Sequence, residues 1–448
     1  MKKVVMIFLS IMILLSFSIK VYAKDTFKSI NKYEEENLEY ILKSYDKNNK
    51  IDGIVTTGTY KIKKIESKEK DDSNIIVIKY NSDGKELWTY KYGKSGEDKL
   101  YYFNYSYDEN NKIDGYIITV NETKEEKEEK GISPLFIKID LDGKQISETK
   151  LELPANTNIK KVIETKNDSI INGYIVVGET ITNNETNGFI AKYNLNLEKL
   201  MQKEYHEEGY STCIEDIINL NNEETYKAII QYKIAENITN KLVSIDSEYN
   251  ISQTIKEDFT SIDKPRLLSC KEGYILYGYN DEIKLKNNKS TSYYIIKYNA
   301  LNAEEWESIG NVPVENEDNI EIQEITEENN LNYFVMYTND NDKSIEITKV
   351  NSLGEIVEKI KKISNDYYSF ENFYIENDTL YFVGQVNCPD DDNCDYDMKA
   401  LLLISTEDKV IEVEQEDNMA IFIILGTIFI FSILLYILRR KQKMALKQ

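Results

Sequence analysis

The sequence is poor in histidine, cysteine, proline and glycine, and each shortage excludes a class of protein. Its 448 residues contain 1 histidine, 4 cysteines, 5 prolines and 18 glycines. The single histidine, His206, is a poor basis for a Ser-His or Cys-His nucleophile pair, and it is not near any pair of cysteines that would complete a zinc centre. No Pro-rich or Gly/Ser-rich hinge divides the chain. We therefore expect one large domain, no enzyme activity, and no catalytic, cofactor-binding or metal-binding residue.

Long apolar runs are confined to the two ends of the chain. Two lysines precede an apolar run at the N-terminus, and residues 1–23 have the pattern of a secretory signal peptide, with an uncleaved anchor as the alternative. Residues 419–438 carry no charge, and as a helix they would span about 30 Å, the thickness of a bilayer core. The basic segment 439–448 follows, so the positive-inside rule predicts a cytoplasmic tail. We therefore expect a single-pass protein of the cell membrane whose residues 24–415 lie outside the cell.

The part of the chain between these ends is strongly acidic. Eight of the 55 basic residues and none of the 78 acidic residues lie in the two end segments, so the remainder carries a net charge of −31. This charge disfavours nucleic acid as a partner. We interpret it as a solvated exterior, and a surface that attracts cations or basic ligands is the alternative.

The middle of the chain contains seven copies of one sequence motif. In the first copy, an apolar strand ends at Tyr80, and the equivalent residues follow at intervals of 52 to 59. They are Tyr80, Ile139, Tyr193, Ile245, Tyr298, Val350 and Ile404. The next residue is Asn or Asp in six of the seven copies, and the preceding residue is Lys in five. Both tryptophans, Trp88 and Trp306, stand eight residues past this position, where we expect packing residues.

A tight turn and a second strand follow this residue in each copy. Asp83 with Gly84, Asp142 with Gly143, and Gly354 are typical of such turns, because glycine there adopts a positive φ at no steric cost. About two dozen residues upstream lies another strand, with Tyr at Tyr116, Tyr174, Tyr274 and Tyr333, and a further apolar segment precedes that one. Four short antiparallel strands repeated about every fifty residues are typical of a β-propeller blade. The sequence therefore predicts an all-β fold, a seven-bladed β-propeller over residues 24–415, with a single transmembrane helix after it.

These motifs resemble those of bacterial exported propeller-repeat proteins with quinoprotein-like blades. The resemblance covers roughly residues 24–415 and rests on the Gly-Tyr strand and the Asp-Gly-Lys hairpin, so it implies a fold and no reaction. The turn from Asp83 to Trp88 is similar to turns of sialidases and quinoprotein dehydrogenases. The sialidase arginine cluster has no counterpart, because Arg266 is the only arginine outside the basic tail.

The four cysteines suggest disulfides, because the chain is expected to be exported. Cys388 and Cys394 flank a short acidic loop that a bond between them would pin, and Cys213 and Cys270 fall at the starts of neighbouring repeats. Asp390 to Asp397 has Asp or Asn at alternating positions (Asp391, Asn393, Asp395 and Asp397), as in part of a calcium loop, but it lacks the glycine and the terminal glutamate of that motif. We expect a polar loop there, with calcium as the alternative.

Two functions fit the sequence. The first is a membrane-anchored extracellular binding, adhesion or scaffold module whose partner is an envelope protein or polysaccharide. The second is a cell-surface glycan hydrolase that uses carboxylates in the propeller channel. Two or three carboxylates that converge in the channel, with one strongly raised pKa, would favour the hydrolase.

Overall fold

A computed structural model describes residues 34–406, apart from several short segments. These are residues 63–71, 83, 94–97, 109, 127–128, 155, 168–169, 183–184, 221–224, 258, 260–262, 271, 281–283, 286–287, 290–291, 312–319, 329–331, 340–343, 365–367, 377–378 and 387–398. The expected signal peptide, transmembrane segment and tail therefore lie outside the described residues, as do Asp83, Cys388, Cys394 and the loop from Asp390 to Asp397. Within the described part, no helix is long and apolar enough to cross a membrane.

The described residues form antiparallel sheets of strands that follow one another in the chain. Six of these sheets have four strands: β1 (Glu34–Tyr45), β2 (Ile51–Ile62), β3 (Asp72–Asn81) and β4 (Glu86–Tyr92); β5 (Lys99–Tyr107), β6 (Ile113–Glu126), β7 (Glu129–Asp140) and β8 (Gln145–Lys150); β9 (Asn158–Asn167), β10 (Ile170–Thr182), β11 (Glu185–Asn194) and β12 (Lys199–Tyr205); β13 (Ser211–Asn219), β14 (Tyr226–Ile234), β15 (Asn237–Ile245) and β16 (Ile251–Lys256); β17 (Asp263–Cys270), β18 (Gly273–Asn280), β21 (Ser292–Asn299) and β22 (Glu304–Asn311); β23 (Ile320–Glu328), β24 (Asn332–Asn339), β25 (Ser344–Val350) and β26 (Ile356–Ser364). One has three: β27 (Tyr368–Glu376), β28 (Thr379–Val386) and β29 (Lys399–Thr406). A two-stranded ribbon, β19 (Lys284–Leu285) with β20 (Asn288–Lys289), extends from the β17 sheet.

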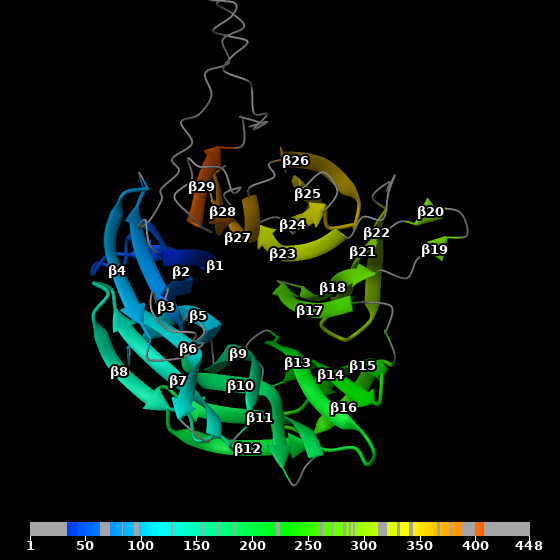
Figure 1. Ribbon diagram of the computed structural model, residues 1–448. Helices are drawn as coiled ribbons and strands as arrows, with labels where there is room; N and C mark the ends of the chain where they lie inside the picture. The colour runs from blue at the N-terminus through cyan, green and yellow to red at the C-terminus, as the bar shows by residue number, and fades with distance from the viewer. Residues whose placement is uncertain are drawn as a thin grey trace, which may run out of the picture.

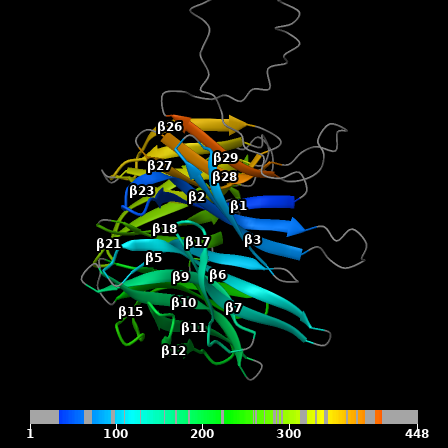
Figure 2. The ribbon, with the colours of Figure 1, turned by 90° about the vertical axis from the view of Figure 1, so that its left-hand side faces the viewer.

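The sheets surround a common axis as the blades of a β-propeller (Figure 1). Each sheet contacts the next in chain order, and β1 contacts β27, β28 and β29, so the first sheet meets the last. Apart from the β19–β20 ribbon, the first strand of each sheet lies nearest the axis, and the fourth strand of each four-stranded sheet lies at the rim. In the view at right angles, the strands run mostly across the picture, along the direction from which Figure 1 is seen (Figure 2). The axis is therefore lined by β1, β5, β9, β13, β17, β23 and β27.

The middle strands are buried on both faces, which explains their continuous apolar runs. Successive side chains of a strand point to opposite faces. In β3, Ile75 and Val77 pack toward the β5 sheet beside Phe103, whereas Ile76 and Ile78 pack on the other face. The recurrent tyrosines share this burial, because Tyr116, Tyr174 and Tyr274 are at most 2% exposed. The prediction that these tyrosines form the core is confirmed, and the Tyr333 side chain lies outside the described part.

The turns between the third and fourth strands have the predicted geometry. Gly84, Gly143 and Gly354 have φ of 72°, 78° and 80°. The Asn or Asp three residues earlier accepts hydrogen bonds from the backbone ahead, as Asp140 does from the amides of Asp142 and Lys144 at 3.0 and 2.8 Å. Where glycine is absent, other residues take the positive φ, namely Leu197, Tyr249 and Asn302.

The two tryptophans join neighbouring sheets, which confirms their expected packing role. The Trp88 indole lies over Gly143 in the turn of the next sheet, where an added Cβ would be 2.6 Å from its Cε3 atom. Its Nε1–H donates to the Leu141 carbonyl at 3.0 Å. Trp306 lies over Gly354 in the same way. Only a turn residue without a side chain leaves room for the indole, so tryptophan in one repeat requires glycine in the next.

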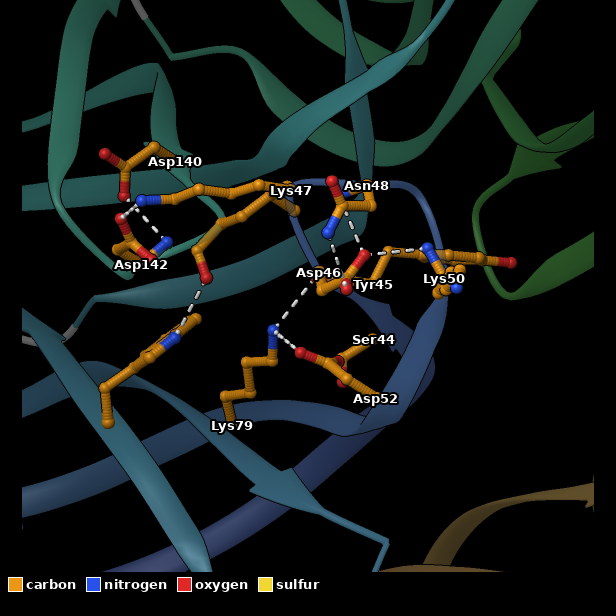
Figure 3. Close-up of polar contacts among 12 residues, drawn as sticks. Ser44, Tyr45, Asp46, Lys47, Asn48, Lys50, Asp52, Lys79, Asp140 and Asp142 are labelled. Carbon is orange, nitrogen blue, oxygen red and sulfur yellow. Dashed lines mark hydrogen bonds and ion pairs between the residues drawn. The ribbon is translucent and has the colours of Figure 1, made fainter.

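A buried ion pair explains why Lys recurs immediately before Tyr80 and its equivalents (Figure 3). Lys79 Nζ lies 2.8 Å from Asp52 Oδ2 and donates to the Tyr45 carbonyl, and Ser44 Oγ donates to Asp52 Oδ1 at 2.6 Å. These contacts join β1, β2 and β3 at one end. Ser106, Asp114 and Lys138 repeat the arrangement in the β5 sheet. This network was not apparent from the sequence, because its three members come from three separate strands.

Cys213 and Cys270 are buried thiols and are not joined to each other, so the proposed pairing was wrong. Cys213 lies near the start of β13, whereas Cys270 is the last residue of β17. Leu267 N donates to Asp216 Oδ2 at 2.8 Å, which aligns these neighbouring strands. Cys213 lies three residues before Asp216, and Cys270 lies three residues after Leu267. Roughly 20 Å of strand therefore separates the two cysteines, at about 3.3 Å per residue. A disulfide requires Cα atoms within about 7 Å.

Candidate functional site

The innermost strands supply the side chains around the axis. Several of these strands contain a β-bulge, which inserts one extra residue into the pairing with the second strand. The bulge leaves a residue opposite no partner on the second strand. The single inserted residues whose side chains are described are Glu39, Tyr101, Lys160, Glu215 and Glu371 in β1, β5, β9, β13 and β27. Buried apolar residues flank the bulges, such as Leu38 and Ile41 around Glu39. We refer to these five as the bulge residues.

Neighbouring bulge residues interact around the axis. Lys160 Nζ lies 3.2 Å from Glu215 Oε1. The Glu39 carboxylate accepts a hydrogen bond from Thr59 Oγ1 at 3.2 Å. Burial raises the pKa of Glu39 from its ordinary 4.5 to about 7, the Thr59 hydrogen bond opposes this rise, and the charge of Glu371 adds to it. One side of the axis therefore carries an ion pair and another carries two neighbouring carboxylates.

A pocket of about 520 Å³ opens among four innermost strands. This volume lies within the range of small-ligand sites, about 300 to 1,000 Å³. Its walls are Tyr102 and Asn104 of β5, residues 161–164 and Lys166 of β9, Ile218 and Asn219 of β13, and Ser269 of β17. We refer to this cavity as the channel pocket. Among the described residues, its charged lining consists of two lysines and one glutamate.

Glu164 is the acidic residue of the channel pocket, and its side chain is only 11% exposed. Burial raises the pKa of Glu164 from 4.5 to about 7, although Lys166, at 3.9 Å, opposes the shift. The negative charge of Glu164 in turn contributes to the raised pKa of Tyr102, Tyr107 and Tyr174, for which burial is the largest cause. The Glu164 carboxyl therefore lies among three tyrosines and can gain or lose a proton near neutral pH.

Three polar atoms at the channel pocket are buried and lack a hydrogen-bond partner within the described part of the chain. They are Glu164 Oε1, the Asn219 side-chain nitrogen and the Tyr102 hydroxyl. Asn104 is a polar neighbour that acts on Tyr102, but no hydrogen bond of regular geometry joins the two side chains. Buried polar groups are nearly always hydrogen-bonded in native proteins. The three atoms are therefore unsatisfied polar groups of residues that line the pocket.

The second lysine of the pocket, Lys161, is held in place by a buried aspartate. Its Nζ atom lies 3.2 Å from Asp216 Oδ1, and the Asp216 side chain is fully buried. Asp216 also accepts hydrogen bonds from the amides of Ile217 and Leu267, both at 2.8 Å. This carboxylate is satisfied by three donors, whereas the Lys161 side chain remains 32% exposed.

The residues predicted from the sequence and those of the pocket are different sets. The turn residues Gly84, Asp142, Gly143 and Gly354 lie in hairpins between third and fourth strands, away from the axis, and their role is structural. Cys213 lies near the bulge residue Glu215 and does not line the pocket, and burial raises its pKa far above the ordinary value, so the thiol is unreactive. The missed signal is the first-strand position that pairs with a buried tyrosine of the second strand, because Glu164, Asn219 and Ser269 pair with Tyr174, Tyr226 and Tyr274.

Comparison with known proteins gives a likeness of fold only. No protein-family model matches the sequence, and no curated protein matches it. Among solved structures, the polysaccharide lyase Uly1 is similar with a TM-score of 0.48 and 8% identity, covering 86% of this chain and 99% of its own. The oligogalacturonate lyase from Vibrio parahaemolyticus has a TM-score of 0.38 and 11% identity, covering 66% and 80%. The WD40 domain of SCAP from fission yeast has 0.41 and 9%, covering 86% and 98%. These values assign neither a substrate nor an activity to this chain.

Proposed function

We propose that the chain is a membrane-anchored extracellular binding module, a seven-bladed β-propeller that presents the channel pocket to an envelope component. A further strand near residues 410–413 would complete the seventh blade, and residues 419–438 would anchor the ring. Residues 439–448 would lie in the cytoplasm. The proposed partner is an envelope protein or polysaccharide.

The observation that carries this proposal is the composition of the channel pocket. A glycoside hydrolase ordinarily needs two carboxyl groups on either side of the reacting bond, roughly 5 to 9.5 Å apart. Within the part of the chain that the structure describes, Glu164 is the only carboxyl group that lines the pocket, and neither histidine nor arginine lines it. One acid surrounded by hydroxyl, amide and ammonium groups suits the recognition of a polar ligand better than hydrolysis.

A second function, a glycan hydrolase, is favoured by one specific observation. Glu39 and Glu371 lie on the neighbouring innermost strands β1 and β27, and the charge of Glu371 raises the pKa of Glu39. Two interacting carboxyl groups with different proton affinities are the arrangement that such enzymes use. Glu39 is hydrogen-bonded to Thr59, however, and neither glutamate lines the channel pocket.

Co-purification with the native envelope tests the first function. The full-length chain, cross-linked in intact cells and isolated in detergent, is expected to retain an envelope protein or polysaccharide. A polar substitution in the channel pocket, Asn219→Asp, should reduce this retention, whereas the exposed rim substitution Leu87→Ser should not. Hydrolysis of an envelope glycan that is lost in both Glu39→Gln and Glu371→Gln would instead establish the hydrolase.

Proteolysis of intact cells tests the orientation. Protease added from outside should digest the repeats and spare only the basic tail. Protection of the repeats in intact cells, followed by digestion after lysis, would contradict the proposed location.

A further inference from the structure

We propose that the channel pocket binds a sugar unit that carries a carboxylate, and that this binding takes up a proton at Glu164. The proposal rests on the binding function above and names the class of ligand. It is carried by the charges of the lining, by the three unpartnered polar atoms and by the volume of the cavity.

The charge of the pocket depends on the protonation of Glu164. Lys161 and Lys166 line the cavity with side chains 32% and 43% exposed, and their acidic neighbours are the buried Asp216 and Glu164. These four groups sum to a charge of +1 when Glu164 is protonated and to zero when it is ionised, although the chain as a whole has a net charge of −23. With Glu164 protonated, an anion enters this pocket more favourably than a cation does, because the cavity walls weaken the screening by water.

The three unsatisfied polar groups in the pocket wall favour a ligand with several hydroxyl groups. The Asn219 nitrogen is a donor, the Tyr102 hydroxyl is a donor and an acceptor, and Glu164 Oε1 accepts when ionised or donates when protonated. The ligand would need hydrogen-bonding groups on several of its sides, because the three residues belong to β13, β5 and β9. A sugar ring with its hydroxyl groups meets this requirement, and about 520 Å³ accommodates one or two rings.

Glu164 couples the ligand to pH. Its carboxyl faces Lys166 on its own strand, Tyr102 and Tyr107 on β5 and Tyr174 on β10, and the uncharged Asn219 and Ser269 line the cavity from β13 and β17. Because Lys166 is the positive group that opposes the high pKa of Glu164, an anionic ligand that attracts Lys166 removes this opposition. The ligand carboxylate also repels an ionised Glu164 directly. Binding should therefore favour the protonated carboxyl, which can donate to the ligand.

Titration calorimetry of the full-length chain in detergent tests the proposal. The probes are methyl glucuronide and methyl glucoside, which differ only in the carboxylate. We expect the glucuronide to bind at least about tenfold more tightly than the glucoside, and to lose affinity by a similar factor between about pH 6 and pH 8. Buffers of different ionisation enthalpy should report proton uptake on binding at about pH 7.

Three variants separate this role from a structural one. Glu164→Gln should bind the glucuronide with an affinity that no longer changes between those pH values, and Lys166→Gln should bind it several-fold more weakly. Lys160→Gln, which removes a positive charge from the same strand outside the pocket lining, should bind like the natural protein. Should Glu164→Gln fail to fold, Lys166→Gln and the proton uptake of the natural protein decide the question.

The outcomes distinguish this inference from the proposed function. Equal affinity for the two glycosides, binding of neither at millimolar concentration, or unchanged pH dependence in Glu164→Gln would overturn the inference. An envelope component that still co-purifies with the chain would then leave the binding function intact with a different ligand. Loss of both results would remove the inference and the function together.

Discussion

Replacing Glu39 by glutamine should stabilise the protein above neutral pH and leave its stability unchanged at acidic pH. Its pKa is raised from 4.5 to about 7, chiefly by burial and further by Glu371. Below pH 4.5 both the folded and the unfolded chain hold the proton. As the pH rises from 4.5 through 7, the unfolded chain releases the proton first, and the fold loses stability.

The expected magnitude follows from the size of the shift. A rise of about 2.5 pKa units corresponds to roughly 3 kcal/mol at 1.36 kcal/mol per unit, and we expect about 2 kcal/mol after solvent relaxation around the carboxylate. Glutamine has nearly the same shape and keeps an oxygen for the Thr59 hydroxyl, which donates at 3.2 Å. The substitution therefore removes the ionisation without removing the hydrogen bond.

Urea denaturation of the full-length chain measures this effect, followed by the fluorescence of its two tryptophans, Trp88 and Trp306. Curves at about pH 4 and about pH 8 should show a stabilisation by Glu39→Gln only at the higher pH. Glu371→Gln is the matched control, and because Glu371 contributes to the shift, the double variant should gain less than the sum of the two. A loss of stability in Glu39→Gln at about pH 8, or an equal change at both pH values, would refute this account of the buried carboxyl.

Three further predictions follow from the packing. Trp88→Ala should lower the free energy of unfolding by about 3 kcal/mol, because it removes the packing on Gly143 and the hydrogen bond to Leu141. Replacement of the half-exposed Leu87 by alanine should cost under about 0.5 kcal/mol, and equal losses would contradict the role of the indole. Gly143→Ala should cost clearly more than Gly209→Ala, since both have a positive φ but only Gly143 lies against an indole, and similar urea midpoints would argue against the contact. Cys213 and Cys270 are buried, so a thiol reagent should label them only after denaturation, and rapid labelling of the native protein would contradict their burial.

The recurrent parts of the fold were predictable because they are buried on both faces. The β3 run from Ile75 to Ile78 packs against two sheets at once, so its apolar character recurs in every copy and reveals the period. The positive φ of Gly84, Gly143 and Gly354 likewise confirms the turns expected from glycine. The pairing of Cys213 with Cys270 was wrong because it was inferred from spacing alone. Spacing placed both cysteines at the starts of repeats, but Cys213 lies near the start of β13 and Cys270 is the last residue of β17.

The bulges could not be predicted from residue type. A bulge is a property of the pairing between a first strand and a second strand, and it places no requirement on the chemistry of the extra side chain. The bulge residues accordingly include glutamate, tyrosine and lysine. Because the bulge positions were unknown, it was not possible to predict which of the 78 acidic residues face the axis.

The position opposite the recurrent tyrosine explains why the candidate site lies where the repeats differ most. On β10, β14 and β18, Tyr174, Tyr226 and Tyr274 are buried in every case, because they fill the space between sheets. Their partners on the first strands are Glu164, Asn219 and Ser269, which share no chemistry because their side chains line a cavity and do not fill the core. A propeller of this kind can therefore change its ligand by substitutions at these paired positions while the tyrosines continue to hold the sheets together. On this argument, exchanging Asn219 for another polar residue should alter ligand binding more than the stability of the fold.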